Sequence, residues 1–174
     1  MVIQSASGDK QALPKETFRP WVRWVNRLSQ PDKDKSGVYL ISRFEQKPPD
    51  GPANPCDQNV VYIGESSRDR FKGRWRSFHR AAFGVNGKHR GGKKYREQFG
   101  GDSSVLYVAT LSSEVLLRVL LGFATCDWFN ITSSNTKVGQ NLAGIEELLI
   151  KYMERNLILL YSLEHGTRPI CNAH

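Results

Sequence analysis

Two short β-rich segments separated by a proline-rich stretch constrain the fold more than any other feature of the sequence. Residues 37–41 (Gly-Val-Tyr-Leu-Ile) and 59–64 (Asn-Val-Val-Tyr-Ile-Gly) have the branched and aromatic content that is typical of strands. The stretch between them, residues 46–58, contains four prolines and cannot form a regular element. Two strands joined by such a loop predict an antiparallel hairpin. Side-chain alternation places Tyr39 and Tyr62 each on the face opposite to its immediate neighbours, and whether they share a face depends on register.

The rest of the pattern predicts helices around a third strand. Residues 15–29 have apolar side chains at helical spacing, and Pro20 is tolerated only near a helix start, so we expect one helix before the hairpin. After the hairpin, an apolar stripe indicates a basic amphipathic helix that ends before Gly84. The stripe consists of Phe71, Trp75, Phe78 and Ala82. Later elements are a strand at 105–110, an apolar helix from 112 or 113 to about 129, and a helix at 141–161.

These elements predict an α+β fold with a small, mixed or antiparallel three-stranded sheet flanked by helices. A chain of 174 residues with 39% apolar content is sized for one hydrophobic core. We expect an N-terminal segment and helix at 1–36, followed by one domain at 37–174. This domain carries a basic insert at 84–101 and a helical insert at about 112–140.

Cysteine usage and hydropathy indicate an intracellular protein. The three cysteines lie far apart and form no CxxC pair, which argues against a disulfide framework or a zinc site. No stretch approaches the roughly 18 uninterrupted apolar residues of a membrane span, and the first residues lack the order of a secretory signal. We therefore expect a cytoplasmic protein without a membrane partner.

Positive charge is concentrated in one part of the sequence. The segment 68–96 contains eleven Lys or Arg and one acid, whereas the rest of the chain has fourteen bases and sixteen acids. This density predicts nucleic acid as the partner, since each neutralised phosphate releases counterions and adds affinity. A solvated cationic face is the alternative interpretation. The residues expected to contact nucleic acid are Arg68, Arg70, Arg76, Arg80, Lys88, Arg90, Lys93, Lys94 and Arg96.

Two tripeptides and the motifs that follow them resemble a family of nucleases. Residues 37–39 (Gly-Val-Tyr) and 62–64 (Tyr-Ile-Gly) are similar to the paired tripeptides that name the GIY-YIG superfamily. Residues 71–75 (Phe-Lys-Gly-Arg-Trp) resemble the arginine segment of that family, residues 146–151 its glutamate helix, and residues 169–172 its terminal asparagine motif. The order of these motifs makes the resemblance specific, and it covers about residues 37 to 172.

The resemblance implies a metal-dependent endonuclease with one Mg²⁺ or Mn²⁺ per active site. Phosphodiester hydrolysis needs a base for water, cationic groups for the charge on the phosphoryl oxygens, and a metal that orients the phosphate. The candidate catalytic residues are Tyr39, Tyr62, Arg74, Lys72, His79, Glu146 and Asn172, with Glu146 as the metal ligand. A tyrosine becomes a usable base only where a metal-bound water or a neighbouring cation favours the phenolate.

The histidines and the tyrosines have alternative interpretations. The family often has a histidine four positions after the arginine, where this chain has Phe78, so the role of His79 is left open. The other histidines, His89, His165 and His174, are interpreted as exposed bystanders. Both tyrosines could be ordinary strand aromatics, and the sequence does not say which of them acts as the base.

Helical geometry separates the adjacent glutamates Glu146 and Glu147. At about 100° per residue, Glu146 falls inside a broad apolar arc, whereas Glu147 lies on the far side with Lys151 and Glu154. The arc consists of Leu142, Ile145, Leu148, Leu149, Ile150, Tyr152 and Met153. A core-facing carboxylate is costly unless it is paired, protonated or bound to a cation, so Glu146 is expected to bind a hard divalent ion. A buried ion pair with Arg74 is the alternative.

These observations favour an endonuclease that cuts double-stranded DNA, in the manner of a restriction enzyme. The glycine-punctuated insert 84–101 is expected to contact the substrate. A catalytically inert nucleic-acid-binding protein on the same scaffold is an alternative, although Tyr39, Tyr62, Arg74 and Glu146 are all retained. An RNA-cleaving enzyme shares the chemistry and is not distinguished by any motif. Cutting both strands with one active site per chain favours a homodimer or two sequential nicks.

Overall fold

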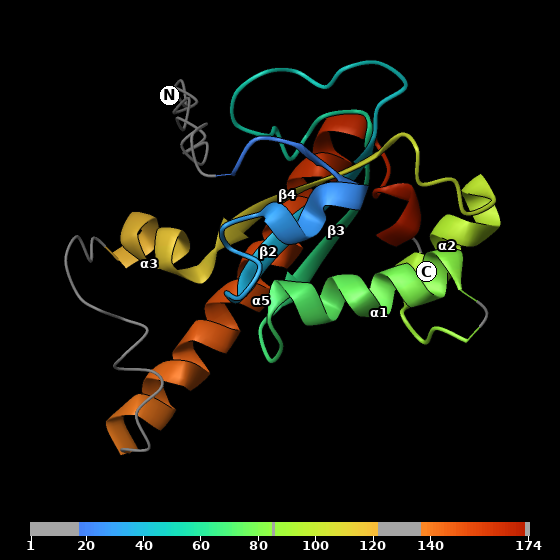
Figure 1. Ribbon diagram of the computed structural model, residues 1–174. Helices are drawn as coiled ribbons and strands as arrows, with labels where there is room; N and C mark the ends of the chain where they lie inside the picture. The colour runs from blue at the N-terminus through green and yellow to red at the C-terminus, as the bar shows by residue number, and fades with distance from the viewer. Residues whose placement is uncertain (1–17, 85, 122–136, 173–174) are drawn as a thin grey trace, which may run out of the picture.

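A four-stranded antiparallel sheet forms the centre of the protein in a computed structural model, which describes residues 18–84, 86–121 and 137–172 (Figure 1). The strands are β1 (Val22–Arg23), β2 (Gly37–Arg43), β3 (Val60–Ser66) and β4 (Leu106–Ser112). Their order across the sheet is β1-β4-β2-β3, so β3 lies at an edge. The fold is α+β as expected, but the sheet has four strands rather than three because the short β1 pairs with β4.

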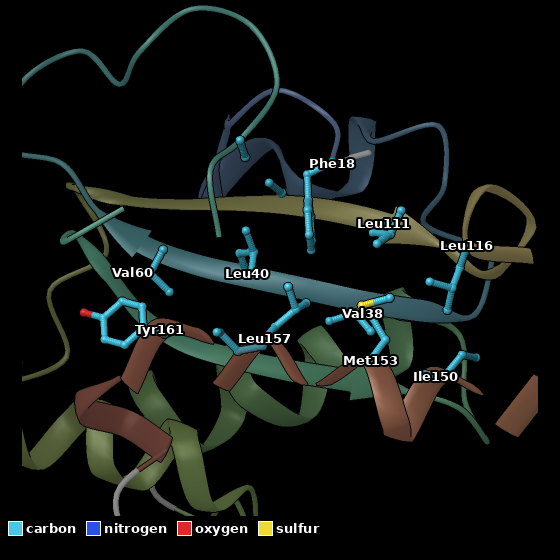
Figure 2. Packing of buried hydrophobic residues seen from close by; sticks show 13 residues of the cluster. Phe18, Val38, Leu40, Val60, Leu111, Leu116, Ile150, Met153, Leu157 and Tyr161 are labelled. Carbon is cyan, nitrogen blue, oxygen red and sulfur yellow. The ribbon is translucent and has the colours of Figure 1, made fainter. Parts of the chain in front are cut away.

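Helices cover both faces of this sheet. They are α1 (Phe71–Phe83), α2 (Arg90–Phe99), α3 (Ser113–Leu121) and α5 (Lys137–His165), with 3-10 helices η1 (Trp24–Ser29) and η2 (Ile170–Asn172). On one face, Val38, Leu40 and Ile63 pack against the C-terminal half of α5 (Figure 2). On the other face, Tyr39 and Tyr62 pack against α1 and α2. The strand alternation therefore separates the face that packs on α5 from the face that carries both tyrosines.

The helix expected at residues 15–29 is wrong for residues 18–23, whereas residues 24–29 form the 3-10 helix η1. Residues 18–23 are extended or irregular, and the Arg19 amide donates to Thr110 O of β4 at 2.8 Å. Phe18 lies in the α5-side core, whereas Trp24 lies in the core on the tyrosine side. An extended segment can deliver these two side chains to opposite faces of the sheet, and Pro20, which lacks an amide hydrogen, does not oppose that conformation.

The basic insert is more ordered than its glycines suggest. Residues 90–99 form α2, and Gly100 ends it in the left-handed conformation with φ of 63°. Gly91 and Gly92 lower the intrinsic helix propensity, yet both are buried against neighbouring elements. The helical insert expected at 112–140 begins as α3, and residues 122–136 lie outside the described part of the chain.

Candidate active site

The two tyrosines share one face of the sheet because of the register between β2 and β3. Tyr39 lies opposite Gly64, and Ile41 lies opposite Tyr62. The tyrosines are therefore diagonal neighbours, with ring centroids 6.0 Å apart.

Gly64 makes room for this tyrosine pair. A Cβ at this position would lie 2.7 Å from Tyr39 Cζ and 2.8 Å from its hydroxyl, and it would also overlap the Tyr62 ring. Gly91 of α2 is in the same situation, because a Cβ there would lie 2.5 Å from Tyr62 Cε2. The two glycines therefore hold β3 and α2 close against the aromatic rings.

The two phenols differ in access and in pKa. Tyr39 is fully buried, whereas Tyr62 retains 8% exposure. Burial raises the pKa of both phenols well above the usual value, and the guanidinium of Arg74 opposes that rise. The interaction between the two side chains raises the pKa of Tyr39 further and lowers that of Tyr62. Tyr62 is therefore the phenol better suited to lose a proton.

His89 contacts this pair from the start of α2, so its interpretation as an exposed bystander is wrong. It is 8% exposed, and its Nδ1 accepts from the Gly92 amide at 3.2 Å, which caps the helix. Its Nε2 lies 3.4 Å from the Tyr39 hydroxyl. Burial and the nearby Arg74 lower the pKa of His89 to about 4, so the ring is neutral at pH 7.

Arg74 supplies positive charge to the same cluster. It is half-buried on α1, and its Nε donates to Glu65 O at 3.1 Å, which ties α1 to the end of β3. Its charge lowers the pKa of Tyr39, Tyr62 and Glu154. An arginine in this position stabilises negative charge that develops beside the tyrosines.

The carboxylate that faces the tyrosines is that of Glu154. It is half-buried on α5, and its pKa is raised to about 7, first by burial and then by the charge of Glu65, against the effect of Arg74. Its charge also raises the pKa of Tyr39 and Tyr62. A carboxylate held at this cost is suited to a compensating cation.

Glu146 is not brought to the tyrosines. It lies two turns before Glu154, or about 12 Å along the helix axis. The face of α5 that packs on the sheet consists of Ile150, Met153, Leu157 and Tyr161. Ile145, Leu148 and Tyr152 are instead exposed, so the core-facing arc assigned to them is wrong. The prediction that placed Glu154 on the far side of the helix is wrong as well, because Glu154 lies at the edge of the buried face.

The exposure of these residues arises because α5 is longer than the sheet on which it packs. The helix has 29 residues and is about 44 Å long, whereas a seven-residue strand spans about 23 Å. Figure 1 shows its N-terminal half extending past the ends of the strands. Apolar residues there have no sheet beneath them. Glu147 has an ordinary role, because it pairs with Arg68 at 2.9 Å and with Lys151.

Asn172 acts on the backbone of the edge strand. Its Oδ1 accepts from the Ile63 amide at 2.8 Å, and its Nδ2 donates to Ile63 O at 2.7 Å. The carboxamide thus satisfies both outward-facing backbone groups of the residue next to Tyr62. The structure places Asn172 at the site, as a residue that positions β3.

These residues surround one groove, which we call the tyrosine groove. It has a volume of about 770 Å³, and its lining includes Tyr62, Arg74, His89, Glu154, Arg168 and Asn172. Five separate chain segments contribute to this lining. Tyr39 lies behind Tyr62, beneath the surface of the groove.

Lys72 and His79 have partners elsewhere. The Lys72 ammonium pairs with Asp34 at 2.6 Å. His79 Nδ1 accepts from Trp24 Nε1 at 3.2 Å, and its ring stacks on that indole. Burial, with a smaller effect of Arg27, lowers the pKa of His79. The structure thus gives the position near the tyrosines to His89 rather than to His79.

Of the eleven basic residues of segment 68–96, six have a partner within the described residues, and Lys72 and Arg74 among them are described above. Arg68 and Lys94 pair with acidic side chains, and Arg70 donates to Asp34 O. Arg96 donates to the carbonyls of Ala81, Ala82 and Gly84, where it caps the C-terminal end of α1. The exposed residues without an ion pair inside the described ranges are Arg76, Arg80, Lys88, Arg90 and Lys93.

The donor set at the groove is compatible with Mg²⁺ or Mn²⁺. Among the residues that the structure describes, no group of three or more His, Cys, Asp or Glu side chains could enclose a metal. Magnesium commonly binds one or two carboxylates and keeps its remaining positions for water and substrate phosphate. The carboxylate of Glu154, which lines the groove together with Arg74, fits that mode.

Comparisons with known proteins identified no relative, so the interpretation of the groove rests on its residues. No family model, curated protein or solved structure matches the chain. Within the described ranges, none of the helices is both long enough and apolar enough to span a membrane.

Proposed function

We propose that this protein is a metal-dependent endonuclease of the GIY-YIG kind that hydrolyses phosphodiester bonds. The observation that carries the proposal is the meeting of Tyr62, Arg74, His89, Glu154 and Asn172 in one groove. A base, an anion-stabilising cation and a carboxylate for a divalent ion are the groups that this hydrolysis requires.

Each group has a role that follows from its contacts. Tyr62 is the proposed base, because it lines the groove and because Arg74 and Tyr39 both act to lower the pKa of its phenol. Arg74 lowers the pKa of that phenol and stabilises charge on the phosphoryl oxygens. Glu154, rather than Glu146, is the proposed metal ligand. The bound cation would neutralise and orient the substrate phosphate.

Nucleic acid is the proposed substrate because the groove is flanked by exposed cations. Lys88 and Arg90 line the groove itself, and Arg76 and Arg80 lie on the exposed side of α1. Double-stranded DNA and restriction-type cleavage are our preferred interpretation, with a homodimer or two sequential nicks to cut both strands. An RNA substrate would use the same groups.

The decisive experiment compares two glutamates on α5. Purified protein is incubated with supercoiled plasmid or RNA, with and without Mg²⁺, and the cut ends are mapped. Glu154→Gln should lower the cleavage rate by about 100-fold or more, while binding is retained. Glu146→Gln is the matched control and should cleave normally.

Two results would contradict this assignment. Loss of cleavage in Glu146→Gln with normal activity of Glu154→Gln would move the metal site to the other end of α5. Tight binding without cleavage of either nucleic acid at any metal concentration would support the inert binding protein instead.

A further inference from the structure

A second cavity lies next to the tyrosine groove, between α1 and the segment that leads into α2. It has a volume of about 390 Å³ and is lined by Arg74, Ser77, Arg80, Asn86, Gly87, Lys88 and His89. Three of these residues, Arg74, Lys88 and His89, also line the tyrosine groove. The two cavities therefore share a wall, and we call the second one the cationic pocket.

The lining of the cationic pocket is suited to an anion. Arg74, Arg80 and Lys88 contribute three positive charges, and none of the described residues that line the pocket is acidic. Ser77 and Asn86 add a hydroxyl and an amide that can donate hydrogen bonds. Guanidinium and ammonium groups with neutral donors beside them are the usual ligands of a phosphate.

The wall of the cationic pocket is anchored at three points. Gly87 packs directly on α1, since a Cβ there would lie 2.5 Å from Ala81 Cβ and would also overlap the Ala81 backbone. The Gly84 carbonyl accepts from Arg96. At the other end, His89 is held by the Gly92 amide and lies 3.4 Å from the Tyr39 hydroxyl. These contacts hold Lys88 between the two cavities.

We propose that the cationic pocket binds the backbone phosphate adjacent to the scissile one, so that the substrate strand crosses Lys88 between the two cavities. This inference rests on the proposed nuclease function, because it takes the tyrosine groove as the position of the scissile phosphate. It assigns Arg80 to one particular phosphate of the strand. Cations outside the pocket contribute only to the general field.

Arg76 is the matched control for Arg80. Both residues are exposed arginines on α1, one turn apart, but Arg76 does not line the cationic pocket. Arg80→Gln and Arg76→Gln therefore remove the same charge from the same helix. Their difference isolates the pocket from the overall charge.

The experiment combines these variants with neutral linkages in the substrate. Binding of a short duplex to full-length protein is measured in a Glu154→Gln background, with single methylphosphonate linkages placed at successive positions. We expect Arg80→Gln to weaken binding about ten-fold. One methylphosphonate linkage beside the scissile position should weaken duplex binding by the Glu154→Gln protein by a similar factor. The same linkage should not weaken binding any further once Arg80→Gln is present. The loss of binding caused by Arg76→Gln should instead be additive with the loss caused by each linkage.

Four outcomes decide the proposal. If no single linkage couples to Arg80, or if Arg76 couples equally, the proposal is overturned. It is also overturned if inorganic phosphate alone binds as tightly as the duplex, because the pocket would then serve a free anion. If the parent protein with Glu154 intact does not cleave but Arg80 still couples to one linkage, the phosphate site stands and the nuclease function fails.

Discussion

Two contacts set the tautomer of His89. Because Nδ1 accepts from the Gly92 amide, the hydrogen of the neutral ring lies on Nε2, which then donates to the Tyr39 hydroxyl. The Tyr39 ring in turn packs against the ring of Tyr62, with centroids 6.0 Å apart. The three side chains thus form one buried cluster that ends at the phenol in the groove. His89 is a positioning residue in this arrangement, since it acts on Tyr62 through Tyr39.

The depressed pKa of His89 predicts a pH-dependent stability. Its pKa is about 4 in the folded protein against an ordinary value of 6.5 for histidine, so protonation favours the unfolded chain. The corresponding stability is present above pH 6.5 and is lost as pH falls from 6.5 through 4. The shift corresponds to about 3 kcal/mol. Urea unfolding at pH 7 and pH 4 checks this prediction. Between these two pH values, the free energy of unfolding should fall by about 3 kcal/mol less in His89→Asn than in the parent protein.

Asparagine is chosen because its side chain also caps a helix and does not titrate. His165→Asn is the control, since His165 is a half-buried histidine that bonds to Cys56 O away from the tyrosines. An equal reduction of the pH effect in both variants would show that the contacts of His89 are not its cause.

The edge strand β3 carries Tyr62, and its position depends on η2. An edge strand exposes unpaired backbone groups and is easily displaced. Asn172 supplies the missing pairing at Ile63, 109 residues away along the chain. The C-terminal 3-10 helix therefore acts as a short substitute for a fifth strand beside the groove.

Removing this pairing should loosen β3 locally. We expect Asn172→Ala to lower the free energy of unfolding by roughly 1–3 kcal/mol, because two hydrogen bonds to buried backbone groups are lost. Amide hydrogen exchange at Ile63 should accelerate more than exchange in β2 or β4. Thr167→Ala, an exposed change in the same tail, should leave that exchange unchanged. Unchanged protection at Ile63 in the Asn172 variant would contradict the pairing role.

At the scale of the whole molecule, the net charge of +8 is unevenly used. Several cations of segment 68–96 make contacts within the protein. Arg96 caps α1, Lys72 pairs with Asp34, and Arg68 pairs with Glu147 of α5. The exposed cations that lie around the groove and the cationic pocket are left for a ligand. Composition alone therefore overstates the number of charges that are available to a ligand.

This division predicts the salt dependence of DNA binding. Five exposed cations, at about 0.9 per phosphate neutralised, give a slope of about −4.5 for log affinity against log salt. A tally of all eleven would give about −10. Lys88→Gln should reduce the slope by about 0.9, whereas Lys72→Gln should leave it unchanged. Fluorescence anisotropy with a labelled duplex at several salt concentrations measures each slope, and a slope near about −10 would show that the internal pairs open on binding.

Local sequence patterns were sufficient to predict the strands around Tyr39 and Tyr62, the apolar stripe of α1 and the cationic segment, because alternation and helical spacing report which side of one element is apolar. The other features depend on contacts between elements. The register of β2 on β3, not their composition, put both tyrosines on one face. Apolar residues lie on all sides of α5, so its sequence does not show which side packs on the sheet. That side, and hence the choice of Glu154 over Glu146, depended on where the sheet ends. The position of His89 required α2 to fold back on α1, which involves contacts between segments that no local pattern encodes.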